Sequence, residues 1–320
     1  MAIQIAFVVL GLAVLLIAGD LLVRGAVGLA SALKIPALIV SLTVVAFGTS
    51  APEMFVSVEA VLSGNAGIAL GNIVGSNIAN ILLVLGVPAL IYPISAHVTG
   101  LRRHGVFMLL ATAAFCAFAY RQGELQLSSG LILFAGIILY IAYMWIRAAR
   151  GMADDPVIDD PSEYGESARL GPKVLLFLAA GLIGLPTGAH LLVTNAAELA
   201  AVLGVREAVI GLTVVAFGTS LPELATVTAA AFHKKSDVAM GGIVGSNIFN
   251  LLAVGGVAGM AGVSRFDPDS LVLDMPVMIA TTVAISVYIF LRRDIGRISG
   301  ALMCLAYVGF IAALAIDAGL

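Results

Sequence analysis

The stretch LTVVAFGTSAPE at residues 42–53 occurs a second time as LTVVAFGTSLPE at residues 212–223. The two copies differ at a single place, so eleven of their twelve positions match. A second pair follows at the same offset of 170, with GNIVGSNIAN at 71–80 and GGIVGSNIFN at 241–250. Two matched pairs in one register predict an internal duplication. Because the identity falls on polar and ionisable residues, which lipid-facing helix surfaces do not need, the duplicated part is expected to form a functional site.

The chain around these repeats is too apolar for a water-soluble protein. Of its 320 residues, 61% are hydrophobic and 11% are charged, whereas a soluble domain has roughly 25% charged residues. Lipid is therefore the expected solvent. The net charge of −3 says little, but the lack of a basic run excludes a typical nucleic-acid binder. The two cysteines, Cys116 and Cys304, lie in apolar segments and are expected to be packing residues rather than a disulfide or a metal site.

Ten segments are apolar enough to cross a bilayer, for which an α-helix needs roughly 20 residues. They are residues 3–30, 37–62, 68–92, 104–120, 127–148, 173–201, 207–232, 238–262, 271–291 and 298–317. No strand-like alternation recurs, so we predict an all-α membrane protein with ten transmembrane helices. The repeat divides it into a first five-helix repeat at 1–148, an acidic cytoplasmic connector at 149–172 and a second five-helix repeat at 173–320.

The basic residues alternate between the two sides of this arrangement. Twelve Lys and Arg residues border or occupy the loops after spans one, three, five, seven and nine, whereas three occupy the opposite loops. The positive-inside rule places the basic loops in the cytoplasm and both termini outside, in a multi-pass protein of the cell (inner) membrane. Since each repeat has an odd number of spans, the second is inverted relative to the first. Secondary transporters with this plan bind their substrates between the two repeats.

Two acids lie in the middle of spans two and seven, at the end of the duplicated stretch: Glu53 and Glu223. A charge at that depth costs roughly 2.5–3.5 kcal/mol. No Lys or Arg lies mid-span, so a permanent salt bridge is excluded, and bound metal ions or exchangeable protons must compensate the two acids. Pro52 and Pro222 precede them, and each removes a helical hydrogen bond and frees carbonyl groups one turn earlier. Freed carbonyls in a membrane helix are tolerated where they line a cavity or bind ions.

The neighbouring polar residues would complete an oxygen-lined site. Thr49 and Glu53 are four residues apart, as are Ser76 and Asn80, so each pair shares one helix face. Inverted halves that meet at the midplane bring together two such sets: Thr49, Ser50, Glu53, Ser76 and Asn80, and Thr219, Ser220, Glu223, Ser246 and Asn250. Neither set contains histidine or sulfur, and oxygen ligands favour hard cations such as Ca²⁺ and Na⁺ over zinc or copper.

These paired blocks make the chain resemble the prokaryotic sodium/calcium exchangers of the cation/calcium exchanger superfamily. The G-T-S-x-P-E and G-S-N-I-x-N blocks are similar to that family's paired α-repeats, and the resemblance covers essentially the whole chain. It implies antiport of Na⁺ against Ca²⁺ by alternating access, usually with three Na⁺ for each Ca²⁺, while spans one and six slide against the rest. We expect no enzymatic activity, no cofactor besides the transported ions, and no obligate protein partner.

The resemblance also implies the ligands. For Ca²⁺ these are two carboxylates and two backbone carbonyls: Glu53, Glu223, Thr49 and Thr219. For Na⁺ they are carbonyls and hydroxyls on either side of the calcium ion: Ala46, Ser50 and Ser76, and Ala216, Ser220 and Ser246. Two amide side chains are implied to orient the glutamates or to bind a central water: Asn80 and Asn250.

The implied three-to-one stoichiometry makes the exchange electrogenic, and two sequence features favour potassium-independent, sodium-coupled exchange. Asn250 stands where potassium-dependent relatives tend to have Asp, although some sodium/calcium relatives also have Asp there. The Thr-Ser pairs stand where proton/calcium exchangers have Asn-Ala. A proton-coupled calcium exchanger and a potassium-dependent exchanger stay open as alternatives, and a passive cation channel would differ by needing no counter-ion. An intramembrane hydrolase is disfavoured, because His97, His104 and His233 lie at loops.

Other polar residues have two interpretations each. Asp20 and His190 are equivalent in the repeat and lie on spans one and six, where they would tune the sliding of these helices or serve as polar packing groups. Glu59, six residues past Glu53, would line the outer entrance or reach the lipid headgroups. The acidic residues of the connector would form a solvated linker or a cation-attracting patch at the inner mouth.

Overall fold

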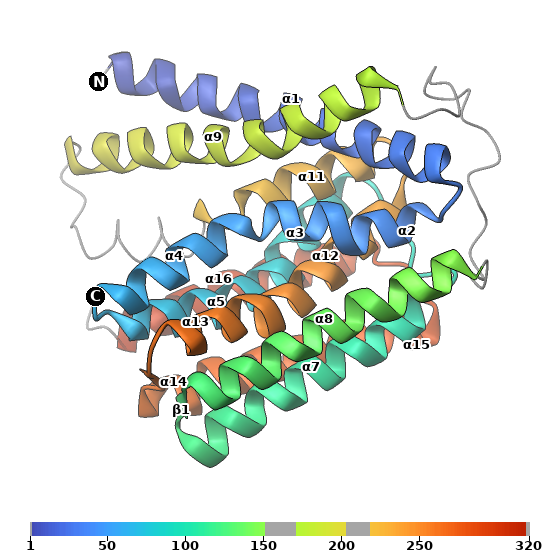
Figure 1. Cartoon of the computed structure of the whole chain (residues 1–320). Coiled ribbons are helices and arrows are strands. Elements are labelled where there is room, and N and C mark those ends of the chain that lie inside the picture. The colour runs from blue at the N-terminus through green and yellow to red at the C-terminus, as the bar shows by residue number, and fades with distance from the viewer. Residues whose placement is uncertain (1, 151–170, 203–217, 318–320) are drawn as a thin grey trace.

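A computed structural model describes residues 2–150, 171–202 and 218–317 of the chain, and most of them are helical (Figure 1). In chain order, with η for a π-helix, the elements are α1 (Ala2–Leu33), α2 (Ala37–Val40), η1 (Ser41–Val45), α3 (Ala46–Thr49), α4 (Ala51–Leu62), α5 (Ala66–Ala79), η2 (Asn80–Val84), α6 (Gly86–Ile91), α7 (Leu101–Gln122), β1 (Glu124–Leu125), α8 (Leu127–Ala149), α9 (Pro172–Val202), α11 (Leu221–Phe232), α12 (Ser236–Phe249), η4 (Asn250–Val254), α13 (Gly255–Ala261), β2 (Ser264–Arg265), α14 (Pro268–Val272), α15 (Asp274–Leu291) and α16 (Arg297–Asp317).

Nine of the ten predicted spans are found among the described residues. Eight helices are long and apolar enough to cross a membrane, and a ninth span is a bent pair, Ala37–Thr49 and Ala51–Leu62, whose parts meet at 41°. The predicted span 207–232 begins in residues outside the described ranges and ends in α11, so the count of ten stays a prediction. The repeat boundaries stay a prediction too, because most of the connector 149–172 lies outside those ranges.

Two short backbone pairings confirm that the repeats are inverted. At one end of the molecule, Ile94 pairs with Ile295 in an antiparallel bridge. At the other end, Leu125 of β1 pairs with Ser264 of β2. Because the repeats are offset by 170 residues, Ser264 is the equivalent of Ile94 and Ile295 is the equivalent of Leu125. Each pairing is therefore the repeat equivalent of the other. One contact made at both ends by equivalent residues is what two oppositely inserted halves produce.

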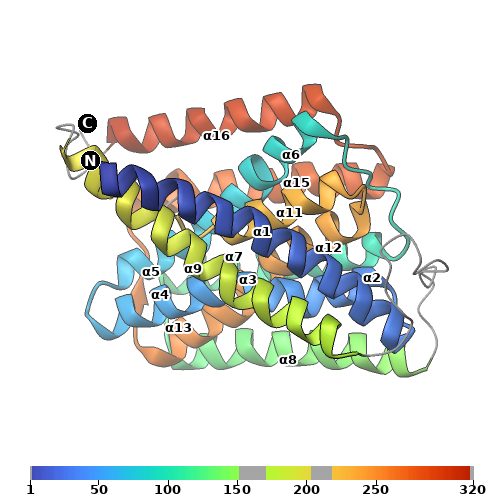
Figure 2. The ribbon, with the colours of Figure 1, turned by 90° about the horizontal axis from the view of Figure 1, so that it is seen from above.

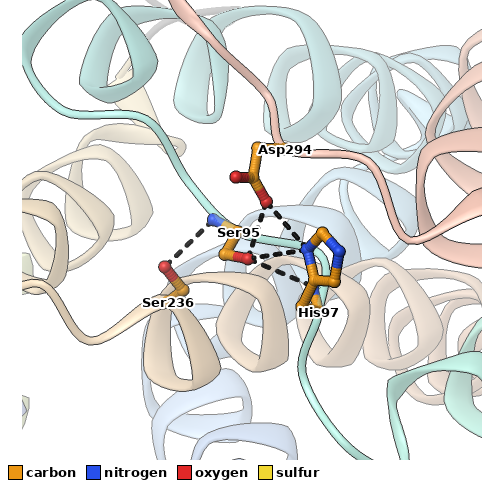
Figure 3. Close-up of polar contacts among 4 residues, drawn as sticks. All are labelled: Ser95, His97, Ser236 and Asp294. Atoms are coloured by element: carbon orange, nitrogen blue, oxygen red, sulfur yellow. Dashed lines mark hydrogen bonds and ion pairs between the residues drawn. The ribbon is translucent and has the colours of Figure 1, made fainter.

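The basic loops gather at one end, as the alternation of charges predicted. Figure 3 shows how three of them are tied together. The Ser95 N–H donates to the Ser236 hydroxyl at 3.0 Å, and the Ser95 hydroxyl donates to the Asp294 carboxylate at 2.7 Å. His97 Nδ1 lies 3.0 Å from the same Asp294 oxygen. The hydrogen bond from the Ser95 hydroxyl foremost, and then the contact with His97, hold the pKa of Asp294 below its ordinary value. At the opposite end, α1 begins and α16 ends (Figure 2).

The helices α1 and α9 form an antiparallel pair that lies across one side of the other helices (Figures 1 and 2). Glycines allow their backbones to approach closely, which is the usual way that membrane helices associate. A Cβ atom at Gly181 of α9 would lie 2.9 Å from the Leu22 backbone nitrogen of α1. A side chain at this position would therefore have to push the two helices apart.

We expect Gly181→Ala to destabilise the protein by about 1–3 kcal/mol, the usual penalty for an overpacked site. Gly309→Ala on α16 is the control, because a Cβ atom there meets nothing within 4 Å. It should be neutral or stabilising by up to about 1 kcal/mol through helix propensity. Thermal unfolding of both variants in detergent measures the difference, and equal midpoints would contradict the close packing of α1 on α9.

Candidate functional site

Spans two and seven break at equivalent residues. Ser50 separates α3 from α4 with φ −85° and ψ 1°, and Ser220 precedes α11 with the same angles. Pro52 and Pro222 stand in the first turn that follows and have no N–H for the carbonyl four residues earlier. The predicted break is thus confirmed in span two, and in the described part of span seven α11 begins at the equivalent place. Each break places a glutamate in the first turn of a new helix, where the unpaired N–H groups of the helix favour negative charge.

The two glutamates are enclosed without a partner. Glu53 is 0% exposed and Glu223 is 2% exposed. Among the described residues, none hydrogen-bonds to any of their four carboxylate oxygens. The two carboxylates lie close enough for their charges to interact. An uncompensated pair of buried charges is strongly unfavourable, so the arrangement requires a bound cation or protons.

Hydroxyl and amide groups from both halves surround the carboxylates. Thr49, Ser50 and Ser246 face the Glu223 carboxylate, and the Thr49 hydroxyl lies 3.3 Å from the Ser246 hydroxyl across the two halves. Several buried oxygens have no hydrogen-bond partner within the described part of the chain: Ser50 Oγ, Ser220 Oγ, Asn80 Oδ1 and Asn250 Oδ1. Leaving such a group unpaired typically costs about 1–3 kcal/mol, and a cation would satisfy several of them at once.

The other predicted site residues have varied surroundings. Ser76, the serine of the first GSN block, is buried on α5. The Ala46 carbonyl accepts the Ser50 N–H at 3.0 Å and faces the Thr49 hydroxyl at 3.4 Å. Thr219 is half-buried and directs its hydroxyl to Asn72. Ala216 lies outside the described residues.

The helix α12, which carries the second GSN block, forms the centre of the bundle. All its residues from Val238 to Phe249 are buried. Gly245 allows it to reach span two, because a Cβ atom there would lie 2.7 Å from Ala46 Cβ and 3.0 Å from Leu42 Cα. This close approach brings Ser246 against Thr49.

Asn72 is a site residue that the sequence reasoning missed. Its amide donates to the Glu53 carbonyl at 3.1 Å and to Ser57 Oγ at 2.9 Å, and its side-chain oxygen accepts from Thr219 Oγ1 at 3.3 Å. It therefore links the two broken helices directly. The repeat could not reveal it, since the equivalent residue is Gly242.

Two asparagines of the repeated blocks also link the halves. The Asn80 amide donates to Asn247 Oδ1 at 3.0 Å, and the Asn247 amide donates to the Asn77 carbonyl at 3.4 Å. The π-helices η2 and η4 begin at Asn80 and Asn250, and neither was predicted. A π-helical turn is rare and is found mostly at functional sites, because its wider turn redirects side chains.

The two halves differ in how α1 covers them. Phe55 and Glu59 on α4 and Ser63 directly after it share one face at i, i+4 and i+8, and all are exposed, Phe55 by 77%. Their repeat equivalents on α11 are covered, with Ala225 exposed by 7% and Ala229 by 8%. The Cβ position of Gly19 on α1 lies only 2.8 Å from the Ala225 carbonyl. The α1 helix therefore packs on α11 and leaves the equivalent face of α4 uncovered.

Comparison with known proteins identifies the family. The model of the sodium/calcium exchanger protein family matches residues 3–148 and 173–315. The chain belongs to the sodium/calcium exchanger family. This confirms the predicted resemblance, and an exchanger of this family is a membrane transporter for Na⁺ and Ca²⁺ rather than an enzyme.

Relatives and solved structures agree with this identification. The exchanger is 34% identical to the Escherichia coli inner membrane protein YrbG, over 98% of this chain and 97% of that protein. It is 30% identical to the sodium/calcium exchanger MaX1 of Methanosarcina acetivorans, over 95% and 96% of the two chains. Its fold matches the sodium-calcium exchanger NCX_Mj with a TM-score of 0.82 and 30% identity, over 98% of both chains. The predicted fold class, a helical multi-pass membrane protein, is confirmed.

Proposed function

We propose that this exchanger carries Na⁺ and Ca²⁺ in opposite directions across the plasma membrane by alternating access. The observation that carries the proposal is the pair of buried, unpartnered carboxylates, Glu53 and Glu223, between two inverted halves. Two carboxylates neutralise one divalent cation, which lowers the cost of holding it at low dielectric. The empty site leaves both acids uncompensated, so return without an ion is disfavoured and transport becomes exchange.

The ligands follow from the predicted sets. Ca²⁺ would be held by four groups: the carboxylates of Glu53 and Glu223 and the carbonyls of Thr49 and Thr219. Na⁺ would be held on either side by two sets of oxygens: Ala46, Ser50 and Ser76, and Ala216, Ser220 and Ser246. The amides of Asn80 and Asn250 would orient the glutamates or hold a water. All these ligands are oxygens, as Ca²⁺ and Na⁺ prefer.

The unequal cover of α4 and α11 supports alternating access. With α1 packed on α11, the face of α4 that carries Phe55 and Glu59 stays uncovered toward the end of the molecule opposite the basic loops. The repeat symmetry defines a mirrored state in which α9 packs on α4 and α11 is uncovered. With the basic loops in the cytoplasm and both termini outside, the present state would be open to the outside.

The driving ions can be separated in proteoliposomes. We expect Ca²⁺ flux to follow a Na⁺ gradient, to require no K⁺ and to respond to membrane voltage. If three Na⁺ exchange for one Ca²⁺, one net charge moves per cycle, which is worth about 2.3 kcal/mol per 100 mV. Ca²⁺ flux driven by a pH gradient without Na⁺ would instead identify a proton-coupled exchanger. Flux that requires K⁺ would identify a potassium-dependent exchanger, and flux without any counter-ion would identify a channel.

A further inference from the structure

A polar cluster fastens α1 to the end of α11. Asp20 of α1 directs one carboxylate oxygen to Arg24 Nε at 2.8 Å on the same helix. Its other oxygen is in hydrogen-bonding contact with His233 Nε2. His233 directly follows α11 and precedes Lys234, whose ammonium group lies over the Tyr92 ring in another basic loop. The contact therefore holds α1 against the body near the basic-loop end.

The repeat holds no second copy of this cluster. Adding 170 to 20 and 24 gives His190 and Thr194 on α9, and subtracting 170 from 233 gives Ser63 after α4. None of these three residues is acidic, and His190 is exposed. A contact between His190 and Ser63 would lack a carboxylate, and hydrogen bonds to ionised groups are roughly twice as strong as neutral ones.

We propose that Asp20 and His233 form a one-sided latch, which stabilises the state with α1 packed on α11 over the mirrored state with α9 packed on α4. The latch rests on the proposed alternating access. When α1 leaves α11, Asp20 loses His233, and no equivalent contact forms at α4. An interaction present in only one of two states shifts the equilibrium toward that state.

Arg24 makes this release possible. It lies four residues after Asp20 on the same helix, so it travels with Asp20 and keeps the carboxylate paired in both states. His233 stays with the body. Asp20 and His233 are thus positioning residues. They make the state that is closed at the basic-loop end the more stable one, although the ion site is built from two nearly identical halves.

Thiol labelling measures the latch without requiring transport. Cys116 and Cys304 are first replaced, and Ala229→Cys is introduced on the covered face of α11. A water-soluble maleimide should label it slowly, because it reacts only in the mirrored state. Asp20→Asn should raise the labelling rate about two- to fivefold, the range expected for a partly exposed ion pair. Glu59→Cys, on the uncovered face, should label rapidly in both backgrounds and controls for access of the reagent.

Two further variants separate a latch from simple damage to the fold. The swap Asp20→His with His233→Asp, combined with Arg24→Gln so that no cation stands beside the new histidine, should restore slow labelling of Ala229→Cys. The double variant His190→Asp with Ser63→His should create an equivalent latch in the mirrored state. Because that state becomes more populated, labelling of Ala229→Cys should become faster even though Asp20 and His233 are intact. Unchanged labelling in Asp20→Asn or in the His190/Ser63 variant, or fast labelling in the charge swap, would overturn the latch. If the proposed antiport function were wrong while the latch was right, Na⁺-coupled Ca²⁺ flux would be absent and this labelling pattern would still be observed.

Discussion

Glu223→Gln is expected to abolish Na⁺-driven Ca²⁺ flux, and Glu53→Gln should do the same. Glutamine keeps the size of the side chain and removes one of the two charges that face the cation. One carboxylate 4 Å from a divalent cation contributes about 8 kcal/mol at an effective dielectric constant of 20, so Ca²⁺ binding should weaken by at least about a thousandfold. Flux into proteoliposomes, measured with a Na⁺ gradient, gives the result directly.

Glu124→Gln is the matched control for these variants. Glu124 pairs with Arg265, a largely exposed residue at the end of the molecule, away from the two buried glutamates. Such exposed pairs contribute about 0–1 kcal/mol, so flux should stay close to that of the natural protein. Native flux in both Glu53→Gln and Glu223→Gln would refute the assigned site.

Asn72→Leu is expected to weaken Ca²⁺ binding about ten- to a hundredfold, the usual effect of losing a residue that supports the ligands of a metal. Leucine cannot donate to the Glu53 carbonyl or accept from Thr219, so the two broken helices lose the link that sets their spacing. Calcium-dependent thermal stabilisation in detergent measures the affinity. A ligand at 100 times its Kd stabilises a protein by about 2.7 kcal/mol. The variant should need a Ca²⁺ concentration about ten- to a hundredfold higher to reach the same stabilisation.

Thr112→Val on α7 controls for the loss of a buried polar group. Thr112 is buried like Asn72, but its hydroxyl donates to the Met108 carbonyl of its own helix. Its Ca²⁺ response should match that of the natural protein. If Asn72→Leu and Thr112→Val shifted the response equally, Asn72 would have no special role at the site.

The sequence predicted those parts of the site that occur twice. The break at Ser50, the start of α11 after Ser220, and the burial of Glu53 and Glu223 follow from proline and an unpaired acid in each copy. Asn72 could not be found this way, because Gly242 takes its place in the second copy. Its role depends on a contact with Thr219, 147 residues away in the chain.

The conformation of the exchanger could not be predicted from the repeat. Two copies of one motif suggest equal surroundings. In the proposed alternation, however, α1 packs on α11 in one state and α9 packs on α4 in the other, so the two copies are not covered equally at the same time. The unequal cover of Phe55 and Ala225 arises just past the repeated stretch, where the two copies also carry different side chains. The π-helices η2 and η4 were missed for a related reason, since packing around Asn80 and Asn250 selects a wider turn that local propensity does not specify.

Calorimetric titration of Ca²⁺ into sodium-free, detergent-solubilised exchanger tests the central claim most directly. If Glu53 and Glu223 jointly hold the transported ion, one Ca²⁺ should bind per chain, Na⁺ should displace it, and either glutamine variant should lose the binding heat. Calcium that bound equally well to Glu53→Gln and Glu223→Gln, or that Na⁺ could not displace, would contradict a shared site between the two halves.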